Sequence, residues 1–351
     1  MKPWENNIRK VVPYIPGEQP TGNNIVKLNT NECPYPPSPK VAEAIQKTNT
    51  EHLRLYPDPD AAALTNAIAK YYQVDANCVF VGVGSDDVLG MAFLTFFNSD
   101  LPIVFPDITY SFYDVWADLF QIKYKTMPLT EDFKIRLEDY KEKNGGVIFP
   151  NPNAPTALDM PIEQIEEIVK NNQDVIVIVD EAYIDFGGTS AVELTEKYEN
   201  LLVVQTFSKS RAMAGMRIGF AIGHEDLIAA MKAVKFSYNS YTMNQTAIEA
   251  GIAAIEDDTY FKSLINKVVH TREEAKKRLK ALGFEVSDSK ANFVFVKHSK
   301  KQAEEIFEAL KKKKIYVRYF KKPRIDNYLR ITIGTDEQME RLYGALEEML
   351  L

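Results

Sequence analysis

One lysine, Lys209, lies in a sequence context that could make it a nucleophile. It follows a strongly apolar stretch and Thr206-Phe207-Ser208, and Arg217 comes eight residues later with small residues between them. A lysine amine forms an imine with an aldehyde, and a site that lowers its pKa makes it both nucleophile and base. Thr206, Ser208 and Arg217 would place hydroxyl and guanidinium donors around a phosphate. The spacing therefore indicates a lysine that holds a phosphorylated aldehyde cofactor.

An acidic pair follows the longest apolar run of the chain, residues 175–179. Asp180 comes directly after the run and is followed by Glu181, Ala182 and Tyr183. A carboxylate at the end of a buried strand is costly unless it has a partner. A protonated pyridine nitrogen is such a partner, and Tyr183 could reach a hydroxyl on the same ring. The structural alternative is an aspartate that caps a helix.

Two turns could add contacts to a phosphorylated ring. The first, within residues 81–87, passes through Gly84, Ser85 and Asp86 and opens a predicted helix. Backbone N–H groups at a helix start bind phosphate, and Ser85 would add a hydroxyl. The second is interrupted by prolines, which exclude regular structure, and the amide of its Asn153 could bond a ring oxygen. Each turn alone could equally be a plain connection.

Seven apolar segments are the elements that must position these residues. They are residues 78–83, 102–105, 122–127, 146–149, 175–179, 201–207 and 217–222. Several are almost continuously apolar, which is typical of strands buried on both faces of a mostly parallel sheet. The sites of such folds lie at the carboxyl ends of the strands. We therefore predict an α/β fold with a large domain around a seven-stranded, mostly parallel sheet.

The composition and the hydrophobic pattern of the sequence divide the chain into three parts. Residues 1–40 are rich in Pro, Asn and Gly and predict an extended N-terminal arm. Residues 41–243 would form the large domain. Residues 244–351 contain a long amphipathic stretch over 259–282, a helix stop at Gly283 and further alternating strands and helices. We expect this part to be a smaller α+β domain that packs with the arm.

Composition excludes several classes of protein. With 49 acidic and 42 basic residues and a net charge of −7, no strongly basic half suggests a nucleic acid or an anionic membrane as partner. The two cysteines and four histidines form no cluster with metal-ligand spacing. The apolar stretches are too short to span a bilayer, and the first residues lack the apolar core of a signal peptide. We expect a cytoplasmic protein without a metal.

Together the motifs resemble those of the fold-type I pyridoxal-5′-phosphate (PLP) enzymes, specifically the class II aminotransferases and, among them, the histidinol-phosphate aminotransferases. The resemblance covers nearly the whole chain. Its strongest matches are the Ser-Lys…Arg segment, the Asp-Glu-Ala-Tyr segment and the tail over residues 317–335. It implies PLP as the cofactor and a homodimer with shared active sites.

The resemblance implies a role for each site residue. Lys209 would hold the cofactor as a Schiff base and shuttle a proton, Asp180 would pair with the ring nitrogen, and Tyr183 would bond the ring oxygen. Tyr110 would stack on the ring, and Tyr56 would reach the cofactor phosphate of the neighbouring subunit. The cofactor phosphate would be surrounded by Gly84, Ser85, Asp86, Thr206, Ser208 and Arg217. Arg330 would hold the carboxylate of the amino-acid donor. In the histidinol-phosphate enzymes, Arg318 and Arg330 would meet the substrate phosphate, with Tyr14 and Asn31 closing over it.

The loop after residue 150 departs from that family's pattern. Where the pattern has Asn before Pro-Thr-Gly, this chain has Ala154-Pro155-Thr156-Ala157. Asn153 lies one residue early, so its expected contact with the ring oxygen would be shifted or lost.

The expected reaction converts histidinol phosphate and 2-oxoglutarate into imidazole acetol phosphate and glutamate, a step of histidine biosynthesis. An aromatic-amino-acid aminotransferase and a threonine-phosphate decarboxylase stay open, because the sequence does not settle which bond to the α-carbon is broken. A PLP-binding regulator would need a DNA-binding domain, for which the arm is too short. A nicotinamide-dependent dehydrogenase is disfavoured, because Gly82-Val83-Gly84 lacks the third glycine of that fingerprint.

Overall fold

The seven apolar segments form one sheet, as predicted, in the computed structural model, which describes residues 2–350. The strand order is β2-β8-β7-β6-β5-β3-β4, and only β8 runs antiparallel to its neighbours. The strands are β2 (Val79–Gly82), β3 (Ile103–Pro106), β4 (Tyr124–Met127), β5 (Val147–Pro150), β6 (Val177–Asp180), β7 (Leu201–Thr206) and β8 (Gly219–Gly223).

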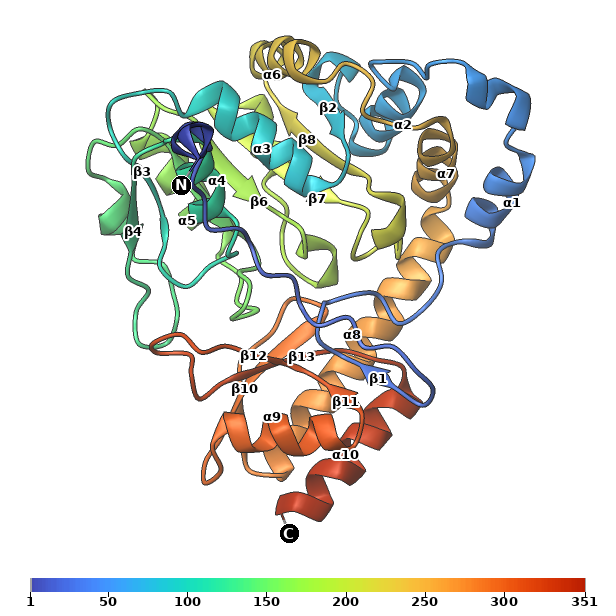
Figure 1. Cartoon of the computed structure of the whole chain (residues 1–351), viewed down its shortest axis with the longest axis vertical. Helices are drawn as coiled ribbons and strands as arrows, with labels where there is room; N and C mark the ends of the chain where they lie inside the picture. The colour runs from blue at the N-terminus through green and yellow to red at the C-terminus, as the bar shows by residue number, and fades with distance from the viewer. Residues whose placement is uncertain (1, 351) are drawn as a thin grey trace.

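Helices cover both faces of this sheet (Figure 1). One face packs against α2 (Ala62–Tyr72), α5 (Ile162–Asn171) and α7 (Gln245–Glu256), and the other against α3 (Ser85–Phe96), α4 (Tyr113–Phe120) and α6 (Glu225–Tyr238). Val177 and Val179 belong to the first core, whereas Ile178 belongs to the second. Since successive side chains of a strand alternate between faces, burial on both explains the continuous apolar runs.

A smaller antiparallel sheet with the order β12-β13-β10-β9 forms the second unit. Its strands are β9 (Phe284–Val286), β10 (Phe293–His298), β12 (Arg318–Tyr319) and β13 (Leu329–Thr332), and its helices are α8 (Asp258–Ala281), α9 (Ala303–Lys312) and α10 (Asp336–Leu350). The long helix α8 begins beside the large unit and runs down into the small one (Figure 1).

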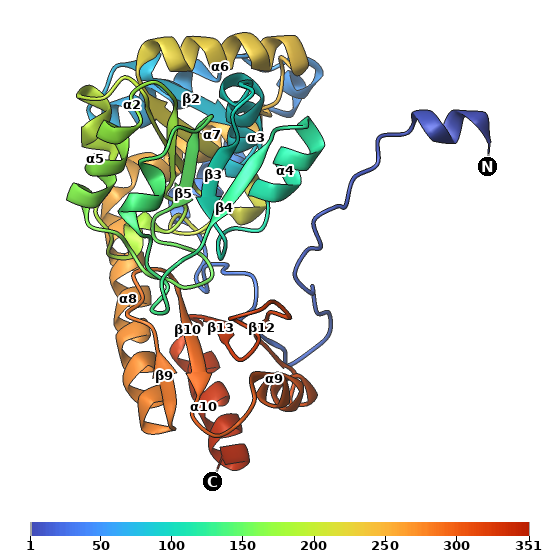
Figure 2. The same cartoon turned by 90° about the vertical axis from the view of Figure 1, so that its left-hand side faces the viewer.

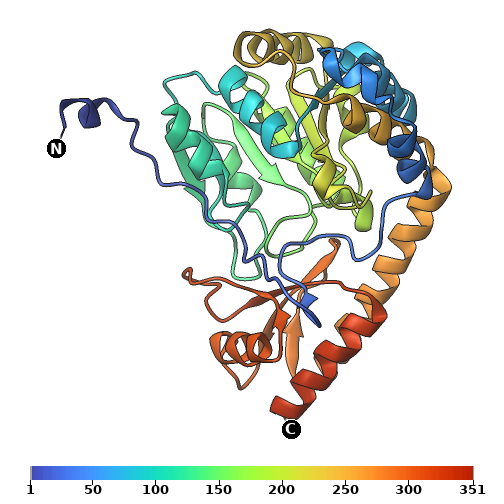
Figure 3. The ribbon, with the colours of Figure 1, turned by 45° about the vertical axis from the view of Figure 1, so that its right-hand side comes forward.

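The N-terminal arm packs partly with the small unit. Its strand β1 (Val26–Lys27) pairs in parallel with β11 (Ile315–Tyr316), and Val26 and Leu28 enter the core of that unit. From Lys2 on, the residues before them form a mostly extended segment at the side of the molecule (Figures 2 and 3). It contacts the rest of the chain where Tyr14 stacks on Phe112 and Glu18 pairs with Lys311.

Helix α7, which we expected in the small domain, packs in the core of the large unit. Its residues Ile248, Ala250 and Ile255 share a core with the sheet. The chain therefore passes between the units after α7, and not at the predicted boundary between residues 243 and 244. The remaining helix of the large unit is α1 (Pro39–Lys47), and short 3-10 turns occur at Pro3–Asn7, Thr50–Arg54, Ala76–Cys78, Leu137–Tyr140, Ile184–Phe186, Val192–Glu196 and Ala214–Met216. Among residues 2–350, no helix has the length and apolar character needed to cross a membrane.

Candidate active site

Two adjoining cavities lie at the carboxyl ends of the large sheet's strands. The smaller has a volume of about 190 Å³ and the larger about 410 Å³. Both are lined by Thr30, Tyr110, Ala154, Tyr183 and Lys209. Because the two cavities share this wall, a molecule in one lies beside a molecule in the other.

Lys209 occupies the shared wall. It comes from the loop that follows β7, and its Nζ donates a hydrogen bond of 3.2 Å to the backbone oxygen of Thr30. Its Nζ also lies 5.8 Å from the ring centre of Tyr183. The amine is therefore within reach of both cavities.

One end of the smaller cavity has the donors of an anion site. Gly84 caps the N-terminus of α3 with a φ of +84°, and a Cβ at this position would lie 2.5 Å from Nη2 of Arg217. Only glycine combines this backbone conformation with so close a guanidinium. The donors that line this end are the side chains of Ser85, Thr206, Ser208 and Arg217. A helix start, three hydroxyls and a guanidinium together are suited to a phosphate.

Asp86 stands beside this end but turns its carboxylate to protein donors. It accepts a hydrogen bond of 2.8 Å from the hydroxyl of Tyr110 and pairs with Arg217 at 3.3 Å. The carboxylate therefore contacts Tyr110 and Arg217 and not the anion site itself. Asp86 still lines the smaller cavity in the first turn of α3, so its place around a phosphate stays a prediction.

Asp180 lies deep in the smaller cavity and is only 4% exposed. Its Oδ1 accepts from the backbone N–H of Ala182 at 3.2 Å, and its Oδ2 accepts from the hydroxyl of Tyr113 at 2.9 Å. Burial raises the pKa of Asp180 to about 6, although both hydrogen bonds favour the ionised form. A cation in the cavity would remove most of the cost of ionising this group.

Tyr113 is a site residue that the sequence reasoning missed. It is fully buried among aromatic side chains, and its hydroxyl donates a hydrogen bond to Asp180. A tyrosine on an otherwise apolar helix face three residues after Tyr110 is the signal that could have indicated it, because a buried hydroxyl needs a partner.

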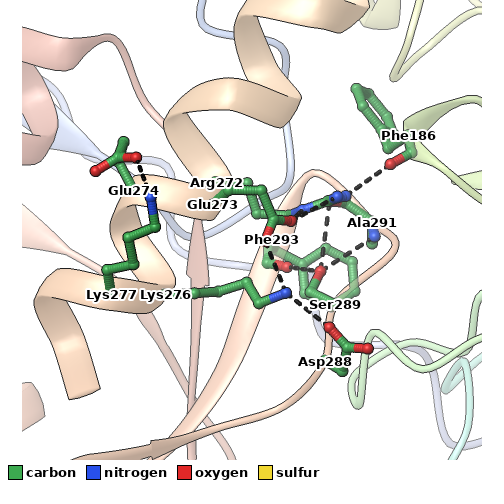
Figure 4. A network of polar contacts seen from close by, with 10 residues as sticks. All are labelled: Phe186, Arg272, Glu273, Glu274, Lys276, Lys277, Asp288, Ser289, Ala291 and Phe293. Carbon is green, nitrogen blue, oxygen red and sulfur yellow. Dashed lines mark hydrogen bonds and ion pairs between the residues drawn. The ribbon is translucent and has the colours of Figure 1, made fainter.

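Tyr183 lines both cavities and is held from three sides. Its ring packs edge-to-face on Phe293 with centroids 5.0 Å apart, and its hydroxyl accepts from Nδ2 of Asn31 at 2.9 Å. The turn that follows it is anchored by Arg272 of α8, whose Nη1 donates to the backbone oxygens of Phe186 at 2.7 Å and Ala291 at 3.0 Å (Figure 4). The small unit therefore fixes the position of this tyrosine.

Asn153 lines neither cavity. Its Nδ2 donates to the backbone oxygen of Ile108 at 3.0 Å and to Oγ1 of Thr156 at 2.9 Å, so the amide stabilises its own loop. The wall that we expected Asn153 to form is made by Ala154, because a shift of one residue turns the side chain away. We no longer assign Asn153 to cofactor binding.

Basic and aromatic side chains line the larger cavity. It is lined by Tyr14, Asn31, Arg318, Lys322, Arg324 and Arg330, among other residues. Within residues 2–350, neither Arg318 nor Arg330 forms an ion pair, and Nε of Arg330 is buried without a partner. Burial lowers the pKa of Arg330. An anionic ligand would offset the cost of this buried charge.

Tyr14 and Tyr56 lie at different places. Tyr14 borders the larger cavity and stacks on Phe112 with ring centres 4.2 Å apart. Tyr56 is 81% exposed, stacks on Tyr241 and lines neither cavity of its own chain.

The fold and the arrangement of lysine, buried carboxylate and anion site define a fold-type I PLP-dependent enzyme. The chain belongs to the aminotransferase class I and II family, whose model matches residues 23–346. It is 54% identical to histidinol-phosphate aminotransferase 1 of Hydrogenovibrio crunogenus, over 99% of this chain and 98% of that protein. It is also 54% identical to the histidinol-phosphate aminotransferase of Brachyspira hyodysenteriae, over 95% of this chain and 94% of that protein.

Solved structures share the fold at lower identity. The histidinol-phosphate aminotransferase of Sinorhizobium meliloti, solved with pyridoxal-5′-phosphate, has a TM-score of 0.84 at 24% identity and covers 92% of this chain and 90% of its own. The L-threonine-O-3-phosphate decarboxylase of Porphyromonas gingivalis has a TM-score of 0.79 at 22% identity, over 93% and 99% of the two chains. The fold therefore does not separate transamination from decarboxylation.

The residues of the smaller cavity fit PLP, the cofactor of this family. The glycine cradle beside Arg217 suits its phosphate, Asp180 suits a protonated ring nitrogen, and Lys209 suits its aldehyde. The side chains that meet here come from the ends of β2, β6 and β7, as the strand-end rule predicts.

Proposed function

We propose that this protein is a PLP-dependent transaminase that acts on histidinol phosphate and 2-oxoglutarate to give imidazole acetol phosphate and glutamate. The observation that carries the proposal is the pair of cavities that share Lys209. The smaller has an anion site, and among the described residues Arg318 and Arg330 line the larger without an ion pair. The two 54% identical relatives, both named histidinol-phosphate aminotransferases, support this substrate.

Bound PLP would supply an aldehyde carbon and a protonated ring that withdraws electrons from the substrate. Lys209 would hold the cofactor and then move a proton at the α-carbon of the substrate, because its amine lies on the wall between the cavities. Asp180 would keep a proton on the ring nitrogen, with its carboxylate oriented by Tyr113 and the backbone of Ala182.

The anion-binding residues divide between cofactor and substrate. Ser85, Thr206, Ser208 and Arg217 would hold the cofactor phosphate. Arg330, with its unpartnered Nε, would bind the carboxylate of glutamate or the phosphate of histidinol phosphate, and Arg318 would assist. One guanidinium can serve either anion, because both offer two acceptor oxygens to its planar fork.

We also propose that the chain works as a cytoplasmic homodimer in which Tyr56 reaches the cofactor phosphate of the partner copy. Around Tyr56, the side chains of Leu53, Leu55, Tyr238 and Tyr241 are largely exposed, which is typical of a surface that another chain covers. A mass near twice 39.9 kDa in sedimentation would support the dimer, and a mass near 39.9 kDa would contradict it.

The absorption spectrum tests the reaction. We expect the purified protein with PLP to have a visible band that moves to the near ultraviolet when L-histidinol phosphate is added alone, and that returns with 2-oxoglutarate. A Lys209→Ala variant should lose the visible band while it keeps its fold by circular dichroism. A band that does not respond to histidinol phosphate would overturn the substrate assignment.

Two further additions separate the rival reactions. Phenylalanine should move the band much less than histidinol phosphate does, and an equal response would favour an aromatic-amino-acid aminotransferase. O-phosphothreonine should release no carbon dioxide, and its release would favour a decarboxylase.

A further inference from the structure

The side chain of Asn31 is held in one orientation by the small unit. Its backbone N–H donates to Oγ1 of Thr332 at 3.0 Å, and that hydroxyl donates in turn to Oδ1 of Asn31 at 3.0 Å. The backbone oxygen of Asn31 accepts from Nδ2 of Asn292 at 2.9 Å. Asn31 is 1% exposed and has a φ of +56°, which asparagine tolerates better than most residues. Because Thr332 occupies Oδ1, the NH₂ group must point the other way.

That NH₂ group points at Tyr183 and determines where the tyrosine proton goes. Nδ2 of Asn31 donates to the Tyr183 hydroxyl at 2.9 Å. A hydroxyl has one proton to donate. No residue among 2–350 accepts the proton of Tyr183 in a hydrogen bond. Since Tyr183 lines both cavities, a ligand there could supply the missing acceptor. Acceptance from Asn31 also polarises the hydroxyl and makes it a stronger donor.

The opposite loop offers no amide to the same space. Ala154 lines both cavities with a methyl group, and the amide of Asn153 is committed to Ile108 and Thr156. A ring oxygen between these walls would therefore depend on Tyr183 for a side-chain donor.

We propose that Asn31 is a positioning residue, which acts through Tyr183 to direct a proton at the oxygen substituent of the bound cofactor ring. Tyr183 would thereby supply the hydrogen bond that Ala154, which has no side-chain donor, does not make. The inference rests on the proposed function, because it requires PLP in the smaller cavity. Asn31 is bonded to β13 and Asn292 of the small unit, whereas Tyr183 follows β6 of the large one. The electronic state of the ring thus depends on the contact between the two units.

A pH titration of the visible band in the PLP-loaded protein tests this proposal. A hydrogen bond to the ring oxygen stabilises the unprotonated form of the chromophore more than the protonated form. In the unprotonated form, the negative charge of the oxygen has no proton of the chromophore beside it. Asn31→Ala should therefore raise the chromophore pKa by about 0.5 to 1 unit, the size expected for one hydrogen bond. Tyr183→Phe should raise it at least as much, and the double variant should equal Tyr183→Phe alone. Additive shifts, or no shift in Asn31→Ala, would overturn the proposal.

Two further variants separate positioning from a merely structural role. Ala154→Asn puts an amide on the opposite wall, so it should reverse most of the shift caused by Asn31→Ala, and no reversal would count against the proposal. Thr332→Val removes the anchor of Asn31 but keeps its amide, so it should shift the chromophore pKa in the same direction by less. If Asn31→Ala does not fold, an unshifted titration in Thr332→Val overturns the proposal.

Failure of this inference and failure of the proposed function have different signatures. A protein that never acquires a visible band with PLP contradicts the proposed function. A normal band whose titration ignores Asn31 contradicts only the role of Asn31.

Discussion

The two cavities are built in different ways. The smaller one is lined mainly from the strand ends of a single sheet, and its polar side chains have protein partners. Asp86 bonds Arg217 and Tyr110 within the cavity, and Asp180 bonds Tyr113, which is buried outside the lining. The larger one is assembled from the N-terminal arm, the large unit and the small unit. Its key cation, Arg330, keeps a buried N–H without a partner.

This difference separates the chemistry from the selection of substrate. Most groups that would act on the cofactor lie at the strand ends of a rigid sheet, which favours precise geometry. Tyr183 is the exception, because Asn31 and Phe293 hold it from outside that sheet. Groups that would bind the changing substrates lie where separate segments meet, so their arrangement depends on how those segments pack. We therefore expect substitutions in the smaller cavity to change the chemical step and those in the larger cavity to change substrate binding.

The largest effect is expected for Asp180→Asn. The amide keeps the shape but does not hold a proton on the ring nitrogen, so kcat should fall by about 10²- to 10³-fold with little change in KM. Steady-state kinetics with histidinol phosphate measures this. A fall of less than about threefold would mean that the ring nitrogen does not depend on Asp180.

The same substitution should stabilise the cofactor-free protein. Burial raises the pKa of Asp180 from 3.8 to about 6, so its stabilising contribution is complete below pH 3.8 and is lost as the pH rises through 6. Relative to the wild type, Asp180→Asn should gain roughly 2–3 kcal/mol in free energy of unfolding above pH 6 and little near pH 4. Urea unfolding of both cofactor-free proteins across this range measures the difference. A gain independent of pH would contradict the assignment to Asp180.

Arg330→Gln should show the opposite kinetic signature. Loss of a charged hydrogen bond to the ligand should lower kcat/KM by about 10- to 100-fold for both histidinol phosphate and glutamate, mainly through KM. Arg324→Gln is the matched control, because Arg324 lines the same cavity but already pairs with Asp107 at 2.9 Å. The control should lose only a few-fold, and equal losses in both variants would remove Arg330 from substrate binding.

Tyr113→Phe should have the smallest effect. Without its hydroxyl, the pKa of Asp180 rises further, so less of the carboxylate is ionised to pair with the ring nitrogen. PLP affinity should fall by about fivefold at pH 6.5 and less at pH 8. Titration of the cofactor-free protein with PLP at both values measures this, and a loss that is the same at both would indicate a packing defect alone.

Much of the large unit and the smaller cavity follows from local sequence. Continuous apolar runs predict strands buried on both faces, and the strand-end rule then brings Ser85, Asp180 and Lys209 to one edge of the sheet. Motifs of this kind can be predicted from the sequence because the residues that determine them are adjacent in the chain. The meeting of Lys209 and Asp180 with hydroxyl and guanidinium side chains at this edge could therefore be predicted without coordinates.

Features that depend on contacts between residues far apart in the sequence could not be predicted in this way. Whether Asn153 or Ala154 faces the cavity depends on the path of the loop, and the packing of α7 depends on which core has room for its apolar face. The partner of Tyr183 lies 152 residues away at Asn31. The local order of apolar and polar residues was enough for the sheet, the lysine and the buried acid. Tertiary structure alone decided which side chains orient them, because a hydrogen bond between remote segments exists only after both have been packed in place.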